Sequence, residues 1–214
     1  MPAWVVILVI VVGSAHLLAY YGGRRGLAGV LKALPILALA GTAATIAPSV
    51  GTLYAMLITV GLLCSAVGDV CLVWPERFTM GLASFLVAHL CYVAAFASGG
   101  LGAMAWPWLV VISMIAAGLL RVLWPHLGQV RWAVLLYVTV IALMAWTAAR
   151  RAALPATPAS SGTLALAGAL AFMVSDGVLA FDQFVRRFHL AYAVVMVTYY
   201  AAQTLIASSV AVFA

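Results

Sequence analysis

Residues 61–78 read GLLCSAVGDVCLVWPERF and place one carboxylate, Asp69, inside an apolar run long enough to cross a bilayer. The chain has only four acidic residues among its 214. A charged group at membrane depth costs about 2.5–3.5 kcal/mol on insertion scales, so such a residue is by default a candidate functional residue. Asp69 is therefore the first candidate for a site in this chain.

A second copy of this pattern, MVSDGVLAFDQF, covers residues 173–184 and contains Asp176. In both copies a small residue precedes the aspartate, leucine follows three positions later and an aromatic residue five positions later. Asp69 and Asp176 are 107 residues apart, half of the chain. This echo predicts an internal repeat of two parallel four-helix halves, residues 1–103 and 104–214.

The composition is that of a polytopic membrane protein. Hydrophobic residues make up 68% of the chain and charged residues 7%, with a mean hydropathy of +1.24, whereas soluble domains are about half apolar and a quarter charged. The net charge of +6 comes from basic residues scattered through short loops, which is typical of membrane proteins and does not indicate nucleic-acid binding.

Breaks at charged residues, prolines and glycine clusters divide the chain into eight predicted membrane-spanning helices. We therefore predict an all-α fold with a single transmembrane domain over residues 1–214. The N-terminal run lacks a basic segment and is expected to be the first span, not a cleaved signal peptide. The predicted spans cover residues 3–21, 28–47, 52–73, 79–97, 105–123, 130–149, 163–181 and 189–212, with a linker over 154–162.

The basic residues predict the orientation. Eight of the ten lie in or beside the loops after spans 1, 3, 5 and 7, and only Arg150 and Arg151 lie elsewhere. The positive-inside rule then places those loops in the cytoplasm and both termini outside. Because the chain is rich in alanine and nine of its ten basic residues are arginine, we expect a bacterial cytoplasmic membrane. Asp69 and Asp176 would lie no more than one or two helical turns below the cytoplasmic surface.

Asp69 and Asp176 are the predicted catalytic residues, and helix packing through small neighbours is the alternative for both. Gly61, Ser65 and Gly68 leave a flat face beside Asp69 that either a helix or a ligand could approach. Lys32 is either a snorkelling interface residue or a phosphate or carboxylate contact. The supporting candidates taken together are Lys32, Ser65, Glu76, His89, Tyr92, Asp182, Tyr199, Tyr200 and Gln203.

Each supporting candidate has a structural alternative. His89, with Tyr92 nearby, either lines a site or makes core hydrogen bonds. Asp182 begins the loop before Arg186 and Arg187 and could pair with either of them. In the last span, Tyr192, Tyr199 and Gln203 share one face, and Tyr200 lies beside it. This face should point into the bundle, where it either lines a pocket or makes polar contacts between helices.

Several chemistries are disfavoured by what the sequence lacks. It has no G-x-S-x-G, HExxH, P-loop or GxGxxG motif, which argues against a serine hydrolase and a nucleotide-binding enzyme. Its three cysteines lie in apolar runs without metal-ligand spacing. His16 and His126 look peripheral. We therefore expect no metal and no cofactor.

Four stretches together resemble the YhhN family, the lysoplasmalogenases: GLLCSAVGD (61–69), RFTMGLASFLVAHLCY (77–92), SD (175–176) and TYYAAQ (198–203). The family has proline directly after the lysine, whereas Ala33 follows Lys32 here. The resemblance implies hydrolysis of the vinyl-ether bond of lysoplasmalogens, 1-alkenyl-glycerophospho-ethanolamine or -choline. The products would be a fatty aldehyde and a glycerophospho-alcohol. It also implies a lysophospholipid as substrate and no cofactor, and nothing indicates oligomeric partners.

Vinyl-ether cleavage suits a pair of carboxyl groups. Protonation of the terminal carbon gives an oxocarbenium ion that adds water, so one acid must be protonated while a second carboxylate stabilises the cation or activates water, as in glycoside hydrolysis. We expect Asp69 and Asp176 to face each other across an apolar cleft, with Lys32 or a loop arginine on the phosphate. The alternative is a proton-coupled small-molecule or lipid transporter that uses the same aspartates.

Overall fold

The protein is described by a computed structural model that covers residues 1–46, 52–100 and 102–212. Within these ranges the chain forms eight α-helices, each long and apolar enough to cross a membrane, and no strand. This confirms the predicted all-α polytopic fold. The helices are α1 (Ala3–Tyr21), α2 (Arg25–Ile46), α3 (Thr52–Cys71), α4 (Phe78–Ala97), α5 (Trp106–Leu123), α6 (Arg131–Ala152), α7 (Ala159–Phe184) and α8 (Ala191–Ala211).

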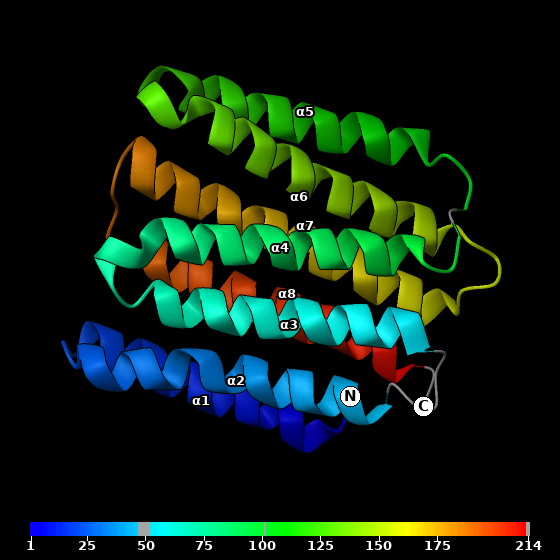
Figure 1. The fold of residues 1–214 in the computed structure, drawn as a ribbon, viewed down its shortest axis with the longest axis horizontal. Coiled ribbons are helices and arrows are strands. Elements are labelled where there is room, and N and C mark those ends of the chain that lie inside the picture. Colours follow the sequence, from blue (N-terminus) through cyan, green and yellow to red (C-terminus); the bar gives the residue numbers. More distant parts are fainter. Residues whose placement is uncertain (47–51, 101, 213–214) are drawn as a thin grey trace.

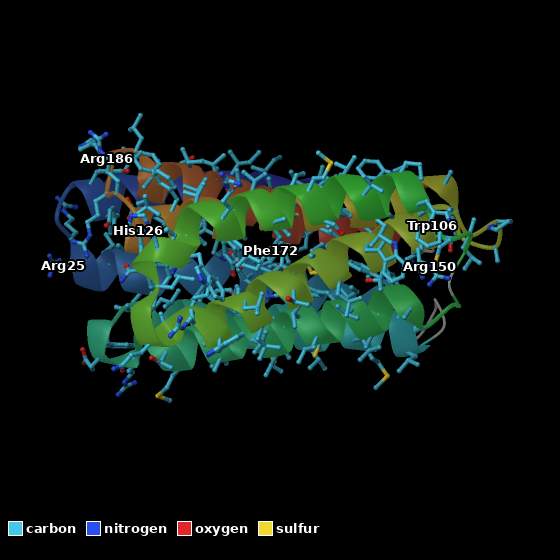
Figure 2. All side chains as sticks on the ribbon, turned by 90° about the horizontal axis from the view of Figure 1, so that it is seen from above. Arg25, Trp106, His126, Arg150, Phe172 and Arg186 are labelled. Carbon is cyan, nitrogen blue, oxygen red and sulfur yellow. The ribbon has the colours of Figure 1, made fainter. Side chains whose placement is uncertain are left out.

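The helices run alternately up and down along one axis of an elongated bundle (Figure 1). The connections after α1, α3, α5 and α7 gather at one end, which we call the odd-loop end, and both termini lie at the other, the terminal end. Figure 2 places Arg25, His126 and Arg186 at the odd-loop end, Trp106 and Arg150 at the terminal end, and Phe172 between them. This arrangement brings most of the arginines together at one end, as the sequence predicted.

Exposed tryptophans mark the two ends of the bundle. Trp74, Trp124 and Trp132 adjoin the odd-loop connections, while Trp4, Trp106 and Trp108 begin helices at the terminal end, and all six are exposed. Indole rings concentrate where a bilayer meets water. The apolar helix faces between the two belts therefore face lipid.

Four of the described helix boundaries differ from the prediction by three residues or more, and one of them is the start of α7, which lies at Ala159 instead of residue 163. The helix α6 continues past Arg150 and Arg151, because the Arg150 guanidinium lies over the Trp146 ring and donates to the Gly102 carbonyl oxygen, and Arg151 packs over the Tyr54 ring. The helix α7 extends to Phe184, so the prediction that Asp182 begins a loop is wrong.

The second helix begins at Arg25, three residues earlier than predicted, and passes through Pro35 without ending. Lys32 therefore lies two turns inside α2 instead of at its start. The predicted end of this span, residue 47, lies outside the described residues.

Packing between α3 and α4 depends on glycine. A Cβ atom added at Gly61 would overlap the Tyr92 ring, and one added at Gly68 would lie 2.7 Å from the Phe85 ring. The flat face predicted beside Asp69 is thus covered by two aromatic rings of α4. Glycine at these positions lets both rings lie directly against the backbone of α3.

Replacing Gly61 by alanine should destabilise the protein by about 1–3 kcal/mol, because the added methyl group must displace the fully buried Tyr92 ring. Thermal unfolding in detergent measures the effect. The matched control is Gly118→Ala on α5, where a new Cβ meets nothing within 4 Å. Equal melting temperatures for the two variants would contradict this account of the α3–α4 contact.

Candidate active site

Asp176 lies deep in the bundle on α7. It is eight residues before the end of the helix at Phe184, about 12 Å at 1.5 Å per residue. Its Oδ2 atom accepts a hydrogen bond of 3.0 Å from the Tyr137 hydroxyl of α6 and lies 3.8 Å from His89 Nε2 of α4. This is more than two turns from the helix end, deeper than predicted, because α7 continues further than the sequence pattern indicated.

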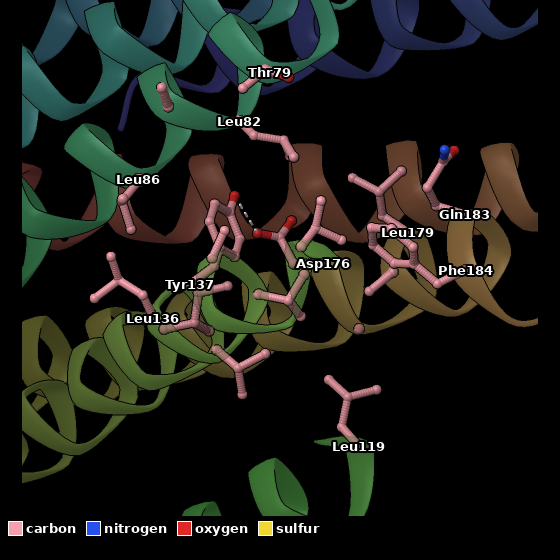
Figure 3. A pocket seen from close by; sticks show the side chains of 18 of the residues that line it. Thr79, Leu82, Leu86, Leu119, Leu136, Tyr137, Asp176, Leu179, Gln183 and Phe184 are labelled. Carbon is pink, nitrogen blue, oxygen red and sulfur yellow. Dashed lines mark hydrogen bonds between the residues drawn. The ribbon is translucent and has the colours of Figure 1, made fainter. Parts of the chain in front are cut away.

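An apolar cavity of about 490 Å³ adjoins Asp176. It lies between α4, α6 and α7 in the odd-loop half of the bundle, with Leu119 of α5 on one side (Figure 3). Leucine, valine, alanine and other apolar residues form nearly all of the lining. Its polar side chains are Thr79, Tyr137, Asp176 and Gln183. The carboxyl group of Asp176 is thus the one acid that this lining presents to a molecule in the cavity.

His89 stands behind Asp176 near the middle of α4 and is completely buried. Its ring centroid lies 4.5 Å from that of Phe172 and 5.6 Å from that of Tyr137. Neither ring nitrogen makes a hydrogen bond of good geometry with a residue that the structure describes, although the ring interacts with the backbone of Phe85, one turn earlier on α4. The 3.8 Å to Asp176 exceeds a hydrogen-bond distance, so a small movement of either side chain would join the two groups.

Asp69 forms a second polar centre, on α3. It is 1% exposed, its Oδ1 atom lies 3.4 Å from Lys32 Nζ of α2, and its Oδ2 atom accepts a 2.7 Å hydrogen bond from Tyr199 of α8. Lys32 is itself buried, and its carbonyl oxygen accepts a hydrogen bond from Tyr200. The snorkelling interpretation of Lys32 is therefore wrong, because its ammonium group points into the bundle and pairs with a carboxylate.

The two aspartates do not line the described cavity together. Asp176 lines the cavity and Asp69 is not part of that lining. No hydrogen bond or ion pair joins the two aspartates within the described ranges. The Phe172 ring lies between their partners, 4.5 Å from the His89 ring and 5.5 Å from the Tyr199 ring. The participation of both aspartates in one reaction stays a prediction.

The face of α8 that the sequence singled out does look into the bundle. Tyr199, Tyr200 and Gln203 are buried, and Gln203 Oε1 accepts a 2.8 Å hydrogen bond from the Tyr92 hydroxyl of α4. Ser65 of α3 is fully buried beside Tyr92. These residues lie between the two aspartates and outside the lining of the cavity.

Two of the acidic candidates lie elsewhere. Glu76 is exposed in a 3₁₀ turn, Pro75–Arg77, at the odd-loop end. Asp182 accepts a hydrogen bond from the Phe188 backbone N–H at 3.0 Å, which closes the connection after α7. It makes no ion pair with Arg186 or Arg187, all three of which the structure describes. Glu76 faces water and Asp182 stabilises the connection after α7, so neither belongs to the polar centre at Asp69 or to the one at Asp176.

Sequence reasoning missed two polar contacts. Tyr137 could have been found as the only tyrosine in the predicted sixth span. His16, predicted to be peripheral, is 1% exposed, with Nδ1 2.8 Å from the Ala28 carbonyl oxygen and Nε2 3.0 Å from the Tyr192 hydroxyl. The prediction for His16 is wrong because α8 packs over the inner face of α1. That contact leaves no local signal in the sequence around His16.

Comparison with known proteins identifies relatives over most of the chain. The sequence matches the YhhN family over residues 27–210. Lysoplasmalogenase TMEM86B of Homo sapiens is 40% identical over 184 residues, which is 85% of this chain and 74% of the relative. Lysoplasmalogenase TMEM86A of Bos taurus is 38% identical over 160 residues, 71% of this chain and 64% of the relative.

A bacterial relative is also similar. The membrane protein YhhN of Escherichia coli O157:H7 is 30% identical over 155 residues, which is 72% of this chain and 73% of the relative. No solved structure matches the chain. With its eight apolar helices and these relatives, the chain is an integral, multi-pass membrane protein of the YhhN family.

Proposed function

We propose that this protein is a membrane-embedded lysoplasmalogenase-like hydrolase that cleaves the vinyl-ether bond of a lysophospholipid. The observation that carries the proposal is Asp176, a carboxyl group at the deep end of an apolar cavity, held by the Tyr137 hydroxyl. Relatives about 40% identical over most of the chain are named lysoplasmalogenases. An acid beside an apolar cavity suits a reaction that protonates an alkene carbon of a lipid.

The cavity provides a place for the reacting part of the lipid. Its leucine, valine and alanine side chains suit the alkenyl chain, while the glycerophosphate group would lie toward the odd-loop end. Arg77 and Arg131 adjoin the lining residues Phe78 and Val130 in sequence, so guanidinium groups are close to that end of the cavity and suit a phosphate. Lys32 is held by Asp69, so the arginines are better placed than Lys32 for this contact.

The chemistry requires one proton donor and one water molecule. The Asp176 carboxylic acid gives its proton to the alkene carbon that is not bonded to the ether oxygen, and that oxygen stabilises the resulting oxocarbenium ion. Water then forms a bond to the cationic carbon and loses a proton to the base, the Asp176 carboxylate or neutral His89. Protonation of the ether oxygen and loss of the hydroxyl proton split the hemiacetal into aldehyde and glycerophospho-alcohol, which regenerates the starting state.

The neighbours of Asp176 have distinct tasks in this scheme. Tyr137 orients the carboxyl group through its 3.0 Å hydrogen bond. His89 can accept a proton once it closes the 3.8 Å gap to Asp176. Asp69 is paired with Lys32 and lies outside the cavity lining. It would affect the reaction indirectly, by holding Tyr199 and α8 in position.

One observation favours the second candidate, a proton-coupled small-molecule or lipid transporter. Asp176 lies about 12 Å from the end of α7, beside the middle of α4, and transport sites usually lie near the bilayer midplane. The assay below separates the two functions. An enzyme releases aldehyde when purified in detergent, whereas transport requires sealed vesicles.

Asp176→Asn should lower the rate of aldehyde release from a lysoplasmalogen by at least a hundredfold in detergent, because it removes the acid, and such groups contribute 10²–10⁴-fold. Tyr137→Phe should lower kcat by roughly tenfold, since the carboxyl group loses its orienting hydrogen bond. Tyr20→Phe is the control, because the Tyr20 ring stacks on Tyr192 at the exposed end of α1 and keeps that contact without its hydroxyl. Full turnover by Asp176→Asn would exclude this mechanism.

Asp69→Asn should remove activity and also lower the melting temperature, because it leaves the Lys32 ammonium buried without its counter-ion. Breaking such a pair costs about 3–5 kcal/mol, whereas replacing both partners is often neutral. The double variant Lys32→Met/Asp69→Asn should therefore recover thermal stability without recovering activity. Activity that returns together with stability would limit the role of Asp69 to folding.

We further propose that the protein resides in a bacterial cytoplasmic membrane with the odd-loop end in the cytoplasm. Seven arginines adjoin the odd-loop connections, and Arg150 and Arg151 lie at the other end. Alkaline phosphatase fused after residue 214 should then be active and green fluorescent protein at the same point dark. An inactive phosphatase together with a fluorescent green fluorescent protein would show the opposite orientation.

A further inference from the structure

Between the two aspartates, α3, α4 and α8 present buried polar atoms that lack hydrogen-bond partners. Ser65 Oγ, both ring nitrogens of His89 and Gln203 Nε2 make no hydrogen bond of good geometry with any residue that the structure describes. All three side chains are 0% exposed. Ser65 interacts weakly with the Tyr92 hydroxyl and Gln203 with the Tyr199 hydroxyl, so these atoms with incomplete hydrogen bonding belong to one region of the bundle.

These atoms lie along a series of neighbouring polar side chains that leads from Asp69 to Asp176, which we call the path. They lie at points where consecutive side chains are not hydrogen-bonded to each other. In the first part of the path, Tyr199 donates to Asp69 at 2.7 Å, and Gln203 follows Tyr199 by one turn on α8. Ser65 precedes Asp69 by one turn on α3. The unpaired Ser65 Oγ and Gln203 Nε2 lie along this part.

The second part of the path leads from Gln203 to Asp176. The Tyr92 hydroxyl donates to Gln203 Oε1 at 2.8 Å, and His89 precedes Tyr92 by one turn on α4. His89 Nε2 then lies 3.8 Å from Asp176 Oδ2. No hydrogen bond joins Tyr92 to His89 or His89 to Asp176 within the described residues, and His89 Nε2 is the ring nitrogen that faces Asp176.

A polar atom that is buried without a partner loses its hydrogen bonds to water and gains none in return, and four such atoms in one region of a membrane protein would be a large penalty. Buried waters typically make about three hydrogen bonds to polar atoms of this kind. We propose that bound water molecules at Ser65, His89 and Gln203 complete a hydrated path from the Lys32–Asp69 pair to Asp176.

The role that we assign to the path rests on the proposed hydrolase function: the path would deliver water to the reaction. Each turnover consumes one water molecule, whose oxygen forms the bond to the oxocarbenium carbon. A lipid that fills the apolar cavity keeps water out on that side of Asp176. The hydrated path reaches Asp176 from the opposite side, through His89, and supplies the water while the lipid is bound. It also explains how Asp69 can affect the reaction without lining the cavity.

Hydroxyl-radical footprinting of the protein in lipid nanodiscs tests the hydration directly. Radiolysis of internal water should oxidise Tyr92 and His89 at least tenfold faster than Phe96, with each rate normalised to that in the unfolded chain. Phe96 is the matched control because it lies one turn beyond Tyr92 on α4 and is equally buried. Tyr92 and His89 rates as low as that of Phe96 would refute the hydrated path.

Two conservative variants test the use of the path. Ser65→Ala and Tyr92→Phe should each lower kcat about tenfold with KM within twofold, and each should lower the labelling of His89. Ser161→Ala should change neither, since Ser161 is equally buried but donates to the Ser209 carbonyl oxygen away from the path. Unchanged kcat and labelling in both variants would overturn the proposal. If the wild-type protein releases no aldehyde, the hydrolase function fails, and the footprint alone still decides the hydration.

Discussion

Burying a carboxyl group inside an apolar helix bundle requires polar partners from other helices, because neither lipid nor the helix itself can supply them. Asp69 obtains Lys32 and Tyr199, and Asp176 obtains Tyr137 with His89 nearby. These contacts tie α3 to α2 and α8, and α7 to α6 and α4. Much of the inner packing of the bundle is thus arranged around two acids.

The partners of the two aspartates correspond in a regular way. Asp69 on α3 contacts α2 and α8, and Asp176 on α7 contacts α6 and α4. If α1–α4 and α5–α8 are equivalent halves, α2 corresponds to α6 and α8 to α4, so each acid meets equivalent helices. This agrees with the predicted four-plus-four repeat, which stays a prediction. The chemistry around the two acids differs, because a buried cation neutralises Asp69 whereas Asp176 faces neutral donors and a cavity.

Under the proposed function the two aspartates have unequal roles. A carboxyl group that lies 3.4 Å from a buried ammonium group is paired with a counter-ion, which suits a structural or electrostatic task. A carboxyl group with a tyrosine hydroxyl at 3.0 Å and an apolar space in front of it is free to exchange a proton with a ligand. The sequence motif around the two aspartates is nearly the same, so it could not distinguish them.

Much of the fold could be predicted from the sequence, because apolar runs of about 20 residues leave the chain little choice but to form spanning helices. One of the missed boundaries involves long side chains. Arg150 and Arg151 continue inside α6 because their guanidinium groups lie over the rings of Trp146, one turn earlier on α6, and Tyr54 of α3, and the contact with Tyr54 cannot be seen from the local sequence.

The candidate site was partly predictable for the same reason. Asp69, Asp176 and His89 stand out as polar groups within apolar runs. The structure buries Asp69 and His89 completely and leaves Asp176 partly open to the cavity, each near other polar groups. Tyr137 and the pairing of Lys32 with Asp69 depend on which helices are neighbours, which no local pattern encodes. The cavity depends on the gap between α4, α6 and α7, and only a three-dimensional arrangement reveals it.

The position of the Lys32–Asp69 pair on consecutive helices has a consequence for biogenesis. Because α3 directly follows α2, the two can enter the bilayer as a helical hairpin with the opposite charges already joined. Inserted singly, each helix would carry one unpaired charge into the hydrocarbon region. Asp176 arrives later in synthesis, when its partners on α4 and α6 have already been made. The order of the helices along the chain thus gives Asp69 its counter-ion, and Asp176 its partners on α4 and α6, as each acid leaves water; Tyr199 of α8 joins Asp69 last.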